Sequence, residues 1–191
     1  MIEVEVKLPL FRRSATERKL RELGFEAEDL IRESDMYYNS KSRDFMKTDE
    51  ALRIRHSDNM TRLTSGCILT YKGPKMDTVS MTRKELETEI GSRENCEAIL
   101  DCLGFSPFFP VNKLRQYYRK DMVEACVDQV EGLGSFLELE ILVEDESKRE
   151  DALKKIETIL HDLDLSLSES TTLSYLCMLL KKDGILPRGS A

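Results

Sequence analysis

The chain opens with MIEVEVKL (residues 1–8), where apolar and charged residues alternate strictly. Successive side chains of a β-strand point to opposite faces, so this alternation predicts a strand with one apolar and one charged face. The charged face carries Glu3, Glu5 and Lys7. Residues two apart on a strand lie about 7 Å apart, so the two glutamates repel each other unless a cation lies between them. This face therefore needs an explanation beyond solubility.

The same patterns predict an α+β protein along the rest of the chain. Further strands are expected at residues 25–39, 51–57, 65–73, 80–90, 105–121, 122–130 and 135–144. Pro107 and Pro110 are expected to interrupt the strand over 105–121, because proline cannot donate to a β-ladder. Residues 40–50 are polar and predict a loop. Amphipathic helices are expected at 14–23, 92–103, 147–163 and 171–182, with Ser92 as an N-cap.

Two segments share one organisation. EVEVKL (3–8) leads to a helix starting with SATE (14–17), and FLELEI (136–141) leads to one starting with SKRE (147–150). Ser-x-x-Glu at a helix start predicts a capping box. We therefore expect a single domain over residues 1–183, built of two pseudo-symmetric halves, followed by a tail over 184–191. The last six residues, LPRGSA, could be native or a remnant of cloning and carry no argument.

Composition narrows the classes of function. The 191 residues carry a net charge of -7, which argues against a nucleic-acid-binding protein. The five cysteines are odd in number and form no C-x-x-C pair, as expected of reduced thiols in a cytoplasmic protein. No apolar run approaches the roughly 20 residues of a membrane helix, and no signal-peptide pattern is present.

Like charges recur two residues apart on other predicted strands, at Arg53 with Arg55 and at Glu138 with Glu140. If the amphipathic helices cover the apolar strand faces, the charged faces point inward and line the lumen of a barrel. The alternative is that they are solvated faces of an open antiparallel sheet. Repulsion between neighbouring like charges argues against that alternative.

The charged residues themselves indicate a ligand. Carboxylates clustered without Cys or His are hard oxygen ligands that suit Mg²⁺ or Mn²⁺. Arginine and lysine suit phosphate oxygens, so the combination predicts a metal–polyphosphate site, and no P-loop is present. The two histidines, His56 and His161, lie outside these motifs, and no Cys–His or Ser–His–Asp arrangement is recognisable in the sequence.

Six motifs then follow one another between Glu3 and Glu140. They are E-x-E-x-K at the start, R-x-R in ALRIR, T-x-K in LTYKGP, K-x-R in VNKLRQYYRK, the aspartate of CVDQV and E-x-E in FLELEI. This series resembles the CYTH superfamily, also called triphosphate tunnel metalloenzymes. D-x-Y-Y at Asp35 and LTYKGP look most like class IV adenylyl cyclase of the CyaB type.

The resemblance implies an eight-stranded antiparallel closed β-barrel with a charged lumen, braced by outer helices. The metal ligands that it implies, for Mg²⁺ or Mn²⁺, are Glu3, Glu5, Asp128, Glu138 and Glu140. The phosphate-binding residues that it implies are Lys7, Arg53, Arg55, Lys72, Lys113 and Arg115. Glu138, Lys113, Arg115 and Asp128 are expected to take part in catalysis. Arg83, Arg119, Glu87 and Glu89 are further candidates for the lumen.

The implied activity is conversion of ATP to cyclic AMP and pyrophosphate. The alternative is an inorganic, thiamine or nucleoside triphosphatase of the same fold. A third hypothesis is a polyphosphate- or nucleotide-binding module without catalysis, although so many carboxylates would weaken simple phosphate capture. The expected partner is ATP or another triphosphate, with no nucleic acid and no membrane. The resemblance implies a homodimer, and the cysteine pattern predicts a cytoplasmic location.

Overall fold

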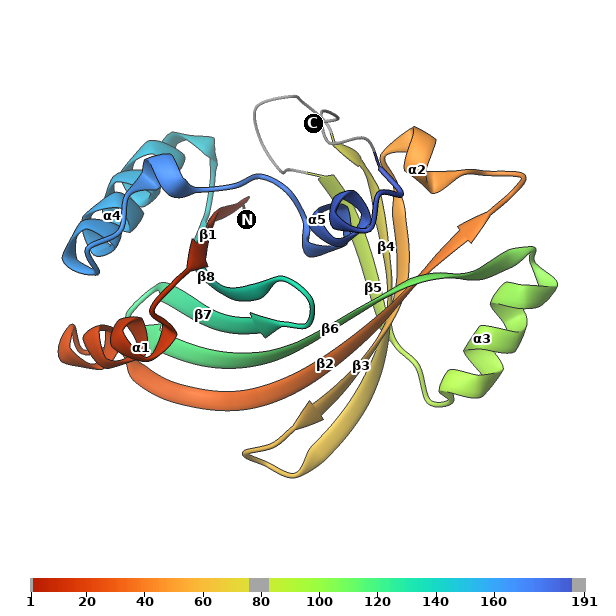
Figure 1. The fold of residues 1–191 in the computed structure, drawn as a ribbon, viewed down its shortest axis with the longest axis horizontal. Helices are drawn as coiled ribbons and strands as arrows, with labels where there is room; N and C mark the ends of the chain where they lie inside the picture. Colours follow the sequence, from red (N-terminus) through yellow and green to blue (C-terminus); the bar gives the residue numbers. More distant parts are fainter. Residues whose placement is uncertain (1, 76–82, 187–191) are drawn as a thin grey trace. The chain divides into compact units, whose positions relative to one another are not determined.

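The computed structural model describes residues 2–75 and 83–186. The helices and strands, with η for 3₁₀-helices, are β1 (Ile2–Leu10), α1 (Arg13–Glu22), β2 (Glu26–Ser40), α2 (Phe45–Thr48), β3 (Ala51–Asn59), β4 (Thr64–Lys75), β5 (Arg83–Glu89), α3 (Arg93–Cys102), β6 (Phe105–Lys120), β7 (Val123–Val130), β8 (Gly134–Val143), η1 (Glu146–Lys148), α4 (Arg149–Asp162), η2 (Leu167–Glu169) and α5 (Tyr175–Lys182). Figure 1 shows these elements along the chain.

The strands form one eight-stranded sheet in the order β1-β8-β7-β6-β2-β3-β4-β5. The chain divides into two compact units, residues 1–30 with 113–191 (unit 1) and residues 31–112 (unit 2). The α+β class and the eight antiparallel strands are therefore confirmed. The strand order begins at β1 and ends at β5, so within the described residues no pairing of these two strands closes the sheet into a barrel.

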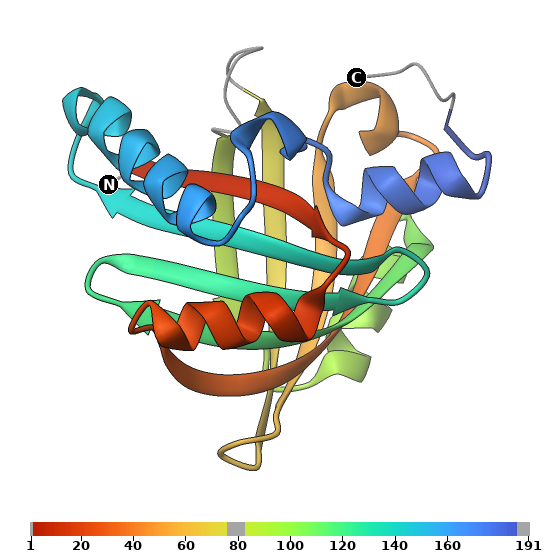
Figure 2. The same ribbon diagram turned by 60° about the vertical axis from the view of Figure 1, so that its left-hand side comes forward.

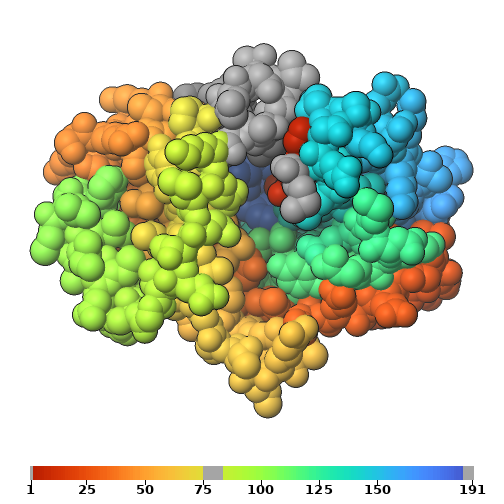
Figure 3. All heavy atoms as spheres, turned by 180° about the vertical axis from the view of Figure 1, so that it is seen from behind, coloured from red at the N-terminus to blue at the C-terminus, as the bar shows by residue number. Residues whose placement is uncertain are grey.

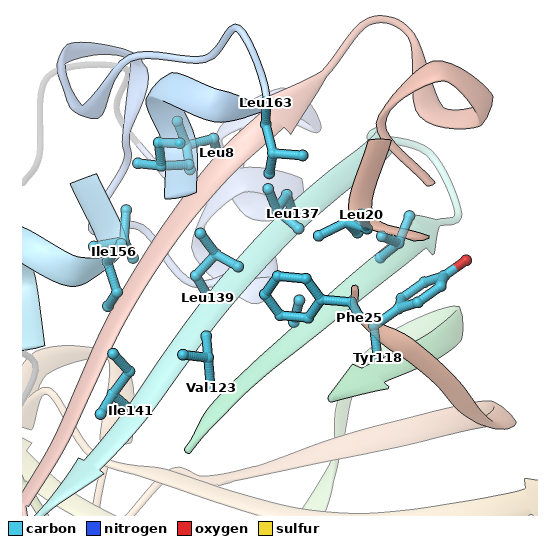
Figure 4. Close-up of a cluster of buried hydrophobic side chains, with 14 of the residues drawn as sticks. Leu8, Leu20, Phe25, Tyr118, Val123, Leu137, Leu139, Ile141, Ile156 and Leu163 are labelled. Carbon is cyan, nitrogen blue, oxygen red and sulfur yellow. The ribbon is translucent and has the colours of Figure 1, made fainter. Parts of the chain in front are cut away.

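The core of unit 1 lies between the sheet and two helices. The apolar residues of β1 alternate with its charged ones and are buried, as Val4, Val6 and Leu8 show. Ile156 and Leu160 of α4 are fully buried in the same cluster, and Figure 2 shows α1 and α4 lying over one face of β1, β8 and β7. The side chains of this cluster interdigitate in Figure 4. In unit 1, helices thus cover the apolar strand faces, as predicted.

Unit 2 has a smaller apolar cluster of its own. Leu52 and Ile54 of β3 pack with Leu100 of α3 and with Phe45 of α2. The ring of Phe45 lies 5.5 Å from that of Phe105. Segment 40–50, expected to be a loop, thus contains a short helix whose aromatic residue helps to close this core.

Pro107 and Pro110 do not interrupt β6, contrary to the prediction. The strand is continuous from Phe105 to Lys120. Its ladder with β7 begins at Lys113, so residues 105–112 lack a β7 partner. Proline is tolerated in a strand where one side has no ladder to complete.

The helix starts were only partly predictable. Ser92 caps α3 as expected, accepting a hydrogen bond from the amide of Asn95 at 3.2 Å. The two capping boxes were wrong, because α1 already begins at Arg13 without a side-chain cap and α4 begins at Arg149 after η1. The support for the sequence repeat is therefore reduced to its two E-x-E strands, β1 and β8. These strands pair with each other in unit 1.

Some predictions fall on residues outside the described ranges. These are much of the turn over 73–80, the start of the strand expected at 80–90, and the last five residues of the tail over 184–191. Among the described helices, none is long and apolar enough to cross a membrane.

Candidate functional site

The register of unit 1 arranges the predicted charged residues in rows across neighbouring strands. Lys7 of β1 lies opposite Glu138 of β8, and Glu5 lies opposite Glu140. The next strand, β7, places Glu124 opposite Glu140. Antiparallel neighbours on one face have Cβ atoms about 5 Å apart, so residues distant in sequence become direct electrostatic partners.

Arg115 of β6 is the centre of the cluster in unit 1. Its Nε and Nη2 donate to the two carboxylate oxygens of Asp128 at 2.7 and 2.6 Å. Nη2 also donates to Glu138. Asp128 is completely buried. Burial alone would lower the pKa of Arg115, but Glu138 and Asp128 outweigh it and hold this pKa well above its usual value.

Two lysines flank this arginine. Lys7 Nζ lies 3.1 Å from Glu138 and 3.4 Å from Glu5, and Lys113 Nζ lies 3.9 Å from Asp128. Burial lowers the pKa of Lys7, yet the negative charges of Glu138 and Glu5 raise it overall. Burial acts oppositely on Glu138, whose pKa is nevertheless held well below its usual value by Arg115, Lys7 and Lys113. All three cations thus lie beside carboxylates that hold them in place.

Tyr175, the first residue of α5, completes the cluster and was not predicted from the sequence. Its hydroxyl donates to Asp128 Oδ2 at 2.8 Å. Lys7 Nζ lies 4.7 Å and Lys113 Nζ 5.4 Å from the centre of its ring, within reach of a cation–π interaction. Burial, followed by Glu138 and Asp128, raises the pKa of Tyr175, so the hydroxyl stays a donor.

The position of Tyr175 depends on how α5 is anchored. Ser174 caps the helix by accepting from the amide of Cys177 at 3.2 Å. At the other end Lys182 donates to the carbonyl of Gly132, in the turn between β7 and β8, beside which α5 lies in Figure 2. A Ser cap directly before an aromatic residue was the available sequence signal, but the partner lies 47 residues away.

A second group in unit 1 is acidic. Glu5, Glu140 and Glu124 lie in one cross-strand row, in which Arg119 donates to Glu124. Burial, then the negative charges of Glu124 and Glu5, raises the pKa of Glu140 to about 7. These three neighbouring carboxylates carry more negative charge than the nearby cations balance. Carboxylate oxygens are suitable ligands of divalent cations, so the row fits such an ion by its chemistry. Within the described residues, however, no three acidic, His or Cys side chains converge in a ready metal-binding group.

The predicted metal ligands therefore occupy different surroundings. Glu5 and Glu140 lie in the acidic row, whereas Asp128 and Glu138 bind Arg115. Glu3 lies opposite Leu142, at the end of the same strand face. Glu124 was not in the predicted set, although period two from Asp128 along β7 leads to it.

Unit 2 holds its arginines in the same manner. Arg55 donates to both oxygens of Asp35, from Nε at 2.6 Å and from Nη2 at 2.7 Å, and Arg53 Nη1 lies 3.3 Å from Asp35. Glu33 lies 3.0 Å from Arg55 Nη1. Burial lowers the pKa of Arg55, but Asp35 and Glu33 raise it overall. The positioning roles of Glu33 and Asp35 were not predicted, and period two along β2 was the signal.

The remaining predicted residues of unit 2 are Arg53, Lys72 and the lumen candidate Glu87. Glu87 accepts from Thr70 at 2.7 Å and lies 3.7 Å from Arg53 Nη2. Among the described residues, the Nε of Arg53 is buried without a hydrogen-bond partner, so it can donate to an anionic ligand. Lys72 Nζ lies 2.9 Å from Glu85.

Two secondary candidates for the lumen, Arg119 and Glu89, receive less support, and a third is not described. Arg119 is half exposed and lies 3.1 Å from Glu28 in unit 1. Glu89 is exposed on β5. The side chain of Arg83 lies outside the described part of the chain.

Comparisons with known proteins find a matching family model and related proteins. The CYTH domain family model matches residues 1–175. A Methanocaldococcus jannaschii protein, provisionally named an adenylate cyclase, is 40% identical over 176 residues, which are 92% of this chain and 97% of that protein. A solved structure of a Pyrococcus horikoshii protein has a TM-score of 0.82 at 39% identity and covers 95% of this chain and 99% of its own.

A more distant structure shares the fold. It comes from Hippeastrum, has a TM-score of 0.63 at 19% identity and covers 99% of both chains. That protein was named for adenylyl cyclase activity and is described as having a dominant triphosphatase activity.

Proposed function

Because this chain belongs to the CYTH domain family, we propose that it is a divalent-metal-dependent enzyme that converts ATP to cyclic AMP and pyrophosphate. The observation that supports the proposal best is the cluster of Lys7, Lys113 and Arg115 around Glu138 and Asp128 in unit 1. Three cations on β1 and β6, held in place by carboxylates, match a ligand with several phosphate groups.

Arg115 offers a planar fork to phosphate oxygens, whereas Lys7 and Lys113 act as point charges. Asp128 and Glu138 fix the orientation of Arg115, so little side-chain freedom is lost when the substrate binds. In unit 2, Arg53, Arg55 and Lys72 are proposed to bind phosphate too, with the buried Nε of Arg53 as one donor. We further propose that the eight strands form a closed barrel, because the CYTH family to which the chain belongs implies one.

In the proposed reaction the ribose 3′-hydroxyl attacks the α-phosphorus and pyrophosphate leaves. Negative charge develops on the leaving group, and Lys113 and Arg115 are proposed to stabilise it. Glu3, Glu5 and Glu140, with Asp128 and Glu138, are the proposed metal ligands. A bound Mg²⁺ or Mn²⁺ would supply positive charge to the phosphate oxygens and acidify the attacking hydroxyl.

The second candidate function is triphosphatase activity, favoured by the description of the Hippeastrum protein. The same cations would bind the triphosphate, and water rather than a ribose hydroxyl would attack the terminal phosphorus. The two reactions differ in which phosphorus faces the nucleophile.

Product analysis separates these functions. The protein is incubated with ATP or tripolyphosphate and Mg²⁺ or Mn²⁺, and the products are resolved chromatographically. Cyclic AMP with pyrophosphate is the expected result. ADP with orthophosphate, or cleavage of tripolyphosphate alone, would replace the cyclase with the triphosphatase. Tight ATP binding without turnover of either compound would contradict both enzymes and favour the binding module.

The same preparation tests the proposed homodimer. Sedimentation velocity is expected to give a mass near twice the 22.0 kDa of one chain. A single species at the mass of one chain would contradict it.

A further inference from the structure

The hairpin of β3 and β4 in unit 2 carries a side-chain cluster that the sequence did not reveal. His56 lies opposite Cys67, and Asp58 lies opposite Ser65, so the two pairs are neighbours on one face of the hairpin. This face of β3 is opposite the one that carries Arg53 and Arg55. The sequence shows no recognisable Cys–His arrangement, but the strand register places His56 directly opposite Cys67.

The four side chains form a continuous chain of contacts. His56 Nδ1 lies 3.2 Å from Cys67 Sγ, and His56 Nε2 lies 3.1 Å from Asp58 Oδ1. Ser65 Oγ donates to the same carboxylate oxygen at 2.7 Å. The arrangement places an imidazole between a thiol and a carboxylate, the geometry that activates a nucleophile.

The Asp58 carboxylate determines which nitrogen of the His56 ring carries the proton. The hydrogen bond from Ser65, together with His56, holds the pKa of Asp58 below its usual value, so Asp58 is ionised and accepts a hydrogen bond from the Nε2–H group of His56. A neutral imidazole with its proton on Nε2 has an acceptor at Nδ1. That acceptor faces the thiol of Cys67.

Two further observations distinguish Cys67 from the other cysteines. Its thiol interacts electrostatically with the guanidinium group of Arg93. Burial raises the pKa of Cys96 and of Cys126, which keeps these two thiols protonated. The His56 and Asp58 side chains are each about one-third exposed, so small reagents can reach the cluster. The β3–β4 turn beside it lies on the surface in Figure 3.

We propose that Cys67, activated by His56 and Asp58, is a modification site that reacts with low-molecular-weight disulfides. The sulfur of Cys67 attacks one sulfur of the disulfide, a new S–S bond forms, and the original S–S bond breaks. The proton of the Cys67 thiol passes to His56 Nδ1, and the leaving thiolate takes up a proton from solvent or from this imidazolium. The electrons balance, because the small disulfide supplies the oxidising equivalent.

The test uses 5,5′-dithiobis(2-nitrobenzoic acid) and glutathione disulfide as probes on the full chain at neutral pH. Peptide mass spectrometry measures the rate at which each cysteine is modified. Cys67 is expected to react about tenfold faster than Cys102, an exposed cysteine that serves as the internal reference. Equal rates, or faster modification of Cys102, would overturn the proposal.

Substitutions isolate the role of the imidazole. His56→Gln is expected to slow Cys67 about tenfold, towards the rate of Cys102, while His161→Gln, at an exposed position on α4, should change neither rate. An unchanged rate at Cys67 in His56→Gln would overturn the proposal. If His56→Gln unfolds, which labelling of the buried Cys126 would reveal, Asp58→Asn is the second variant and should also slow Cys67 selectively. Normal reactivity of Cys67 in a folded Asp58→Asn protein would be equally contradictory.

Discussion

Tyr175 illustrates how much of the site depends on single atoms. Its hydroxyl completes the shell of the fully buried Asp128, which otherwise relies on Arg115 and Lys113. A buried carboxylate is stable only when hydrogen bonds and cations compensate for lost hydration. We therefore expect Tyr175 to act on the proposed phosphate-binding residues through Asp128, as a positioning residue.

Tyr175→Phe tests this role, since it removes the hydroxyl and keeps the ring. We expect a loss of about 1–2 kcal/mol in unfolding free energy, measured by urea titration, and a lower rate of triphosphate turnover. Tyr38→Phe is the matched control, because Tyr38 is a buried tyrosine of unit 2 whose hydroxyl donates to Glu97 at 3.2 Å. The control should lose stability without a comparable loss of turnover. Equal effects on turnover would refute the positioning role.

Glu138 links the cations of the cluster, because it contacts both Lys7 and Arg115. Glu138→Gln should reduce turnover at least about tenfold by removing the charge that orients Arg115. The fold should survive, since Asp128 still binds Arg115 and Glu5 still binds Lys7. Circular dichroism and the product assay check both expectations. The exposed Glu157→Gln of α4 is the control, and wild-type turnover by Glu138→Gln would remove Glu138 from the site.

At the level of elements, some segments were readable from local sequence and others were not. β1 and α4 were predictable because their apolar residues repeat with the period of a strand or a helix and are buried in one cluster. The prediction that Pro107 and Pro110 interrupt the strand was wrong, because the effect of these prolines depends on whether β7 pairs at their positions. Short helix α2 was missed, since burial of Phe45 rather than a periodic pattern stabilises it.

The junction of α2 and β3 gives a prediction about pH. Glu50 accepts hydrogen bonds from Thr48, Tyr71 and Arg43, and although burial opposes them, these bonds lower the pKa of Glu50. The folded pKa thus lies below the unfolded value of about 4.3. Glu50 consequently contributes stability at neutral pH that is lost as pH falls through its folded pKa.

Urea midpoints measured between pH 7 and pH 3 check this expectation. Stability should fall less steeply with acidification in Glu50→Gln than in the unmodified protein, because the variant has no carboxylate to protonate there. The exposed Glu157→Gln should retain the original pH dependence. Parallel curves for Glu50→Gln and the unmodified protein would contradict the role of Glu50.

For the molecule as a whole, the two units repeat one principle. Arg115 in unit 1 donates two hydrogen bonds to a buried aspartate, and Arg55 in unit 2 does the same. Each unit also buries its own apolar cluster, separate from these charges. Stability should therefore depend mainly on the apolar clusters, while the charged faces are proposed to bind the ligand.

Metal removal tests that division. Treatment with EDTA should abolish turnover of ATP or tripolyphosphate, while circular dichroism and the urea midpoint change little. Activity should return with Mg²⁺ or Mn²⁺. Full turnover in EDTA would rule out the proposed metal dependence, and unfolding in EDTA would assign the metal a structural role instead.

MIEVEVKL and the strands that follow it determined the α+β class, the apolar face of each strand and the set of charged residues, because strand periodicity is a local property. The tertiary structure alone decided the partners of those charges. Register brought Glu5 to Glu140 and His56 to Cys67, and the anchoring of α5 brought Tyr175 to Asp128. Such pairings depend on how distant segments align in space, which alternation within one strand does not encode.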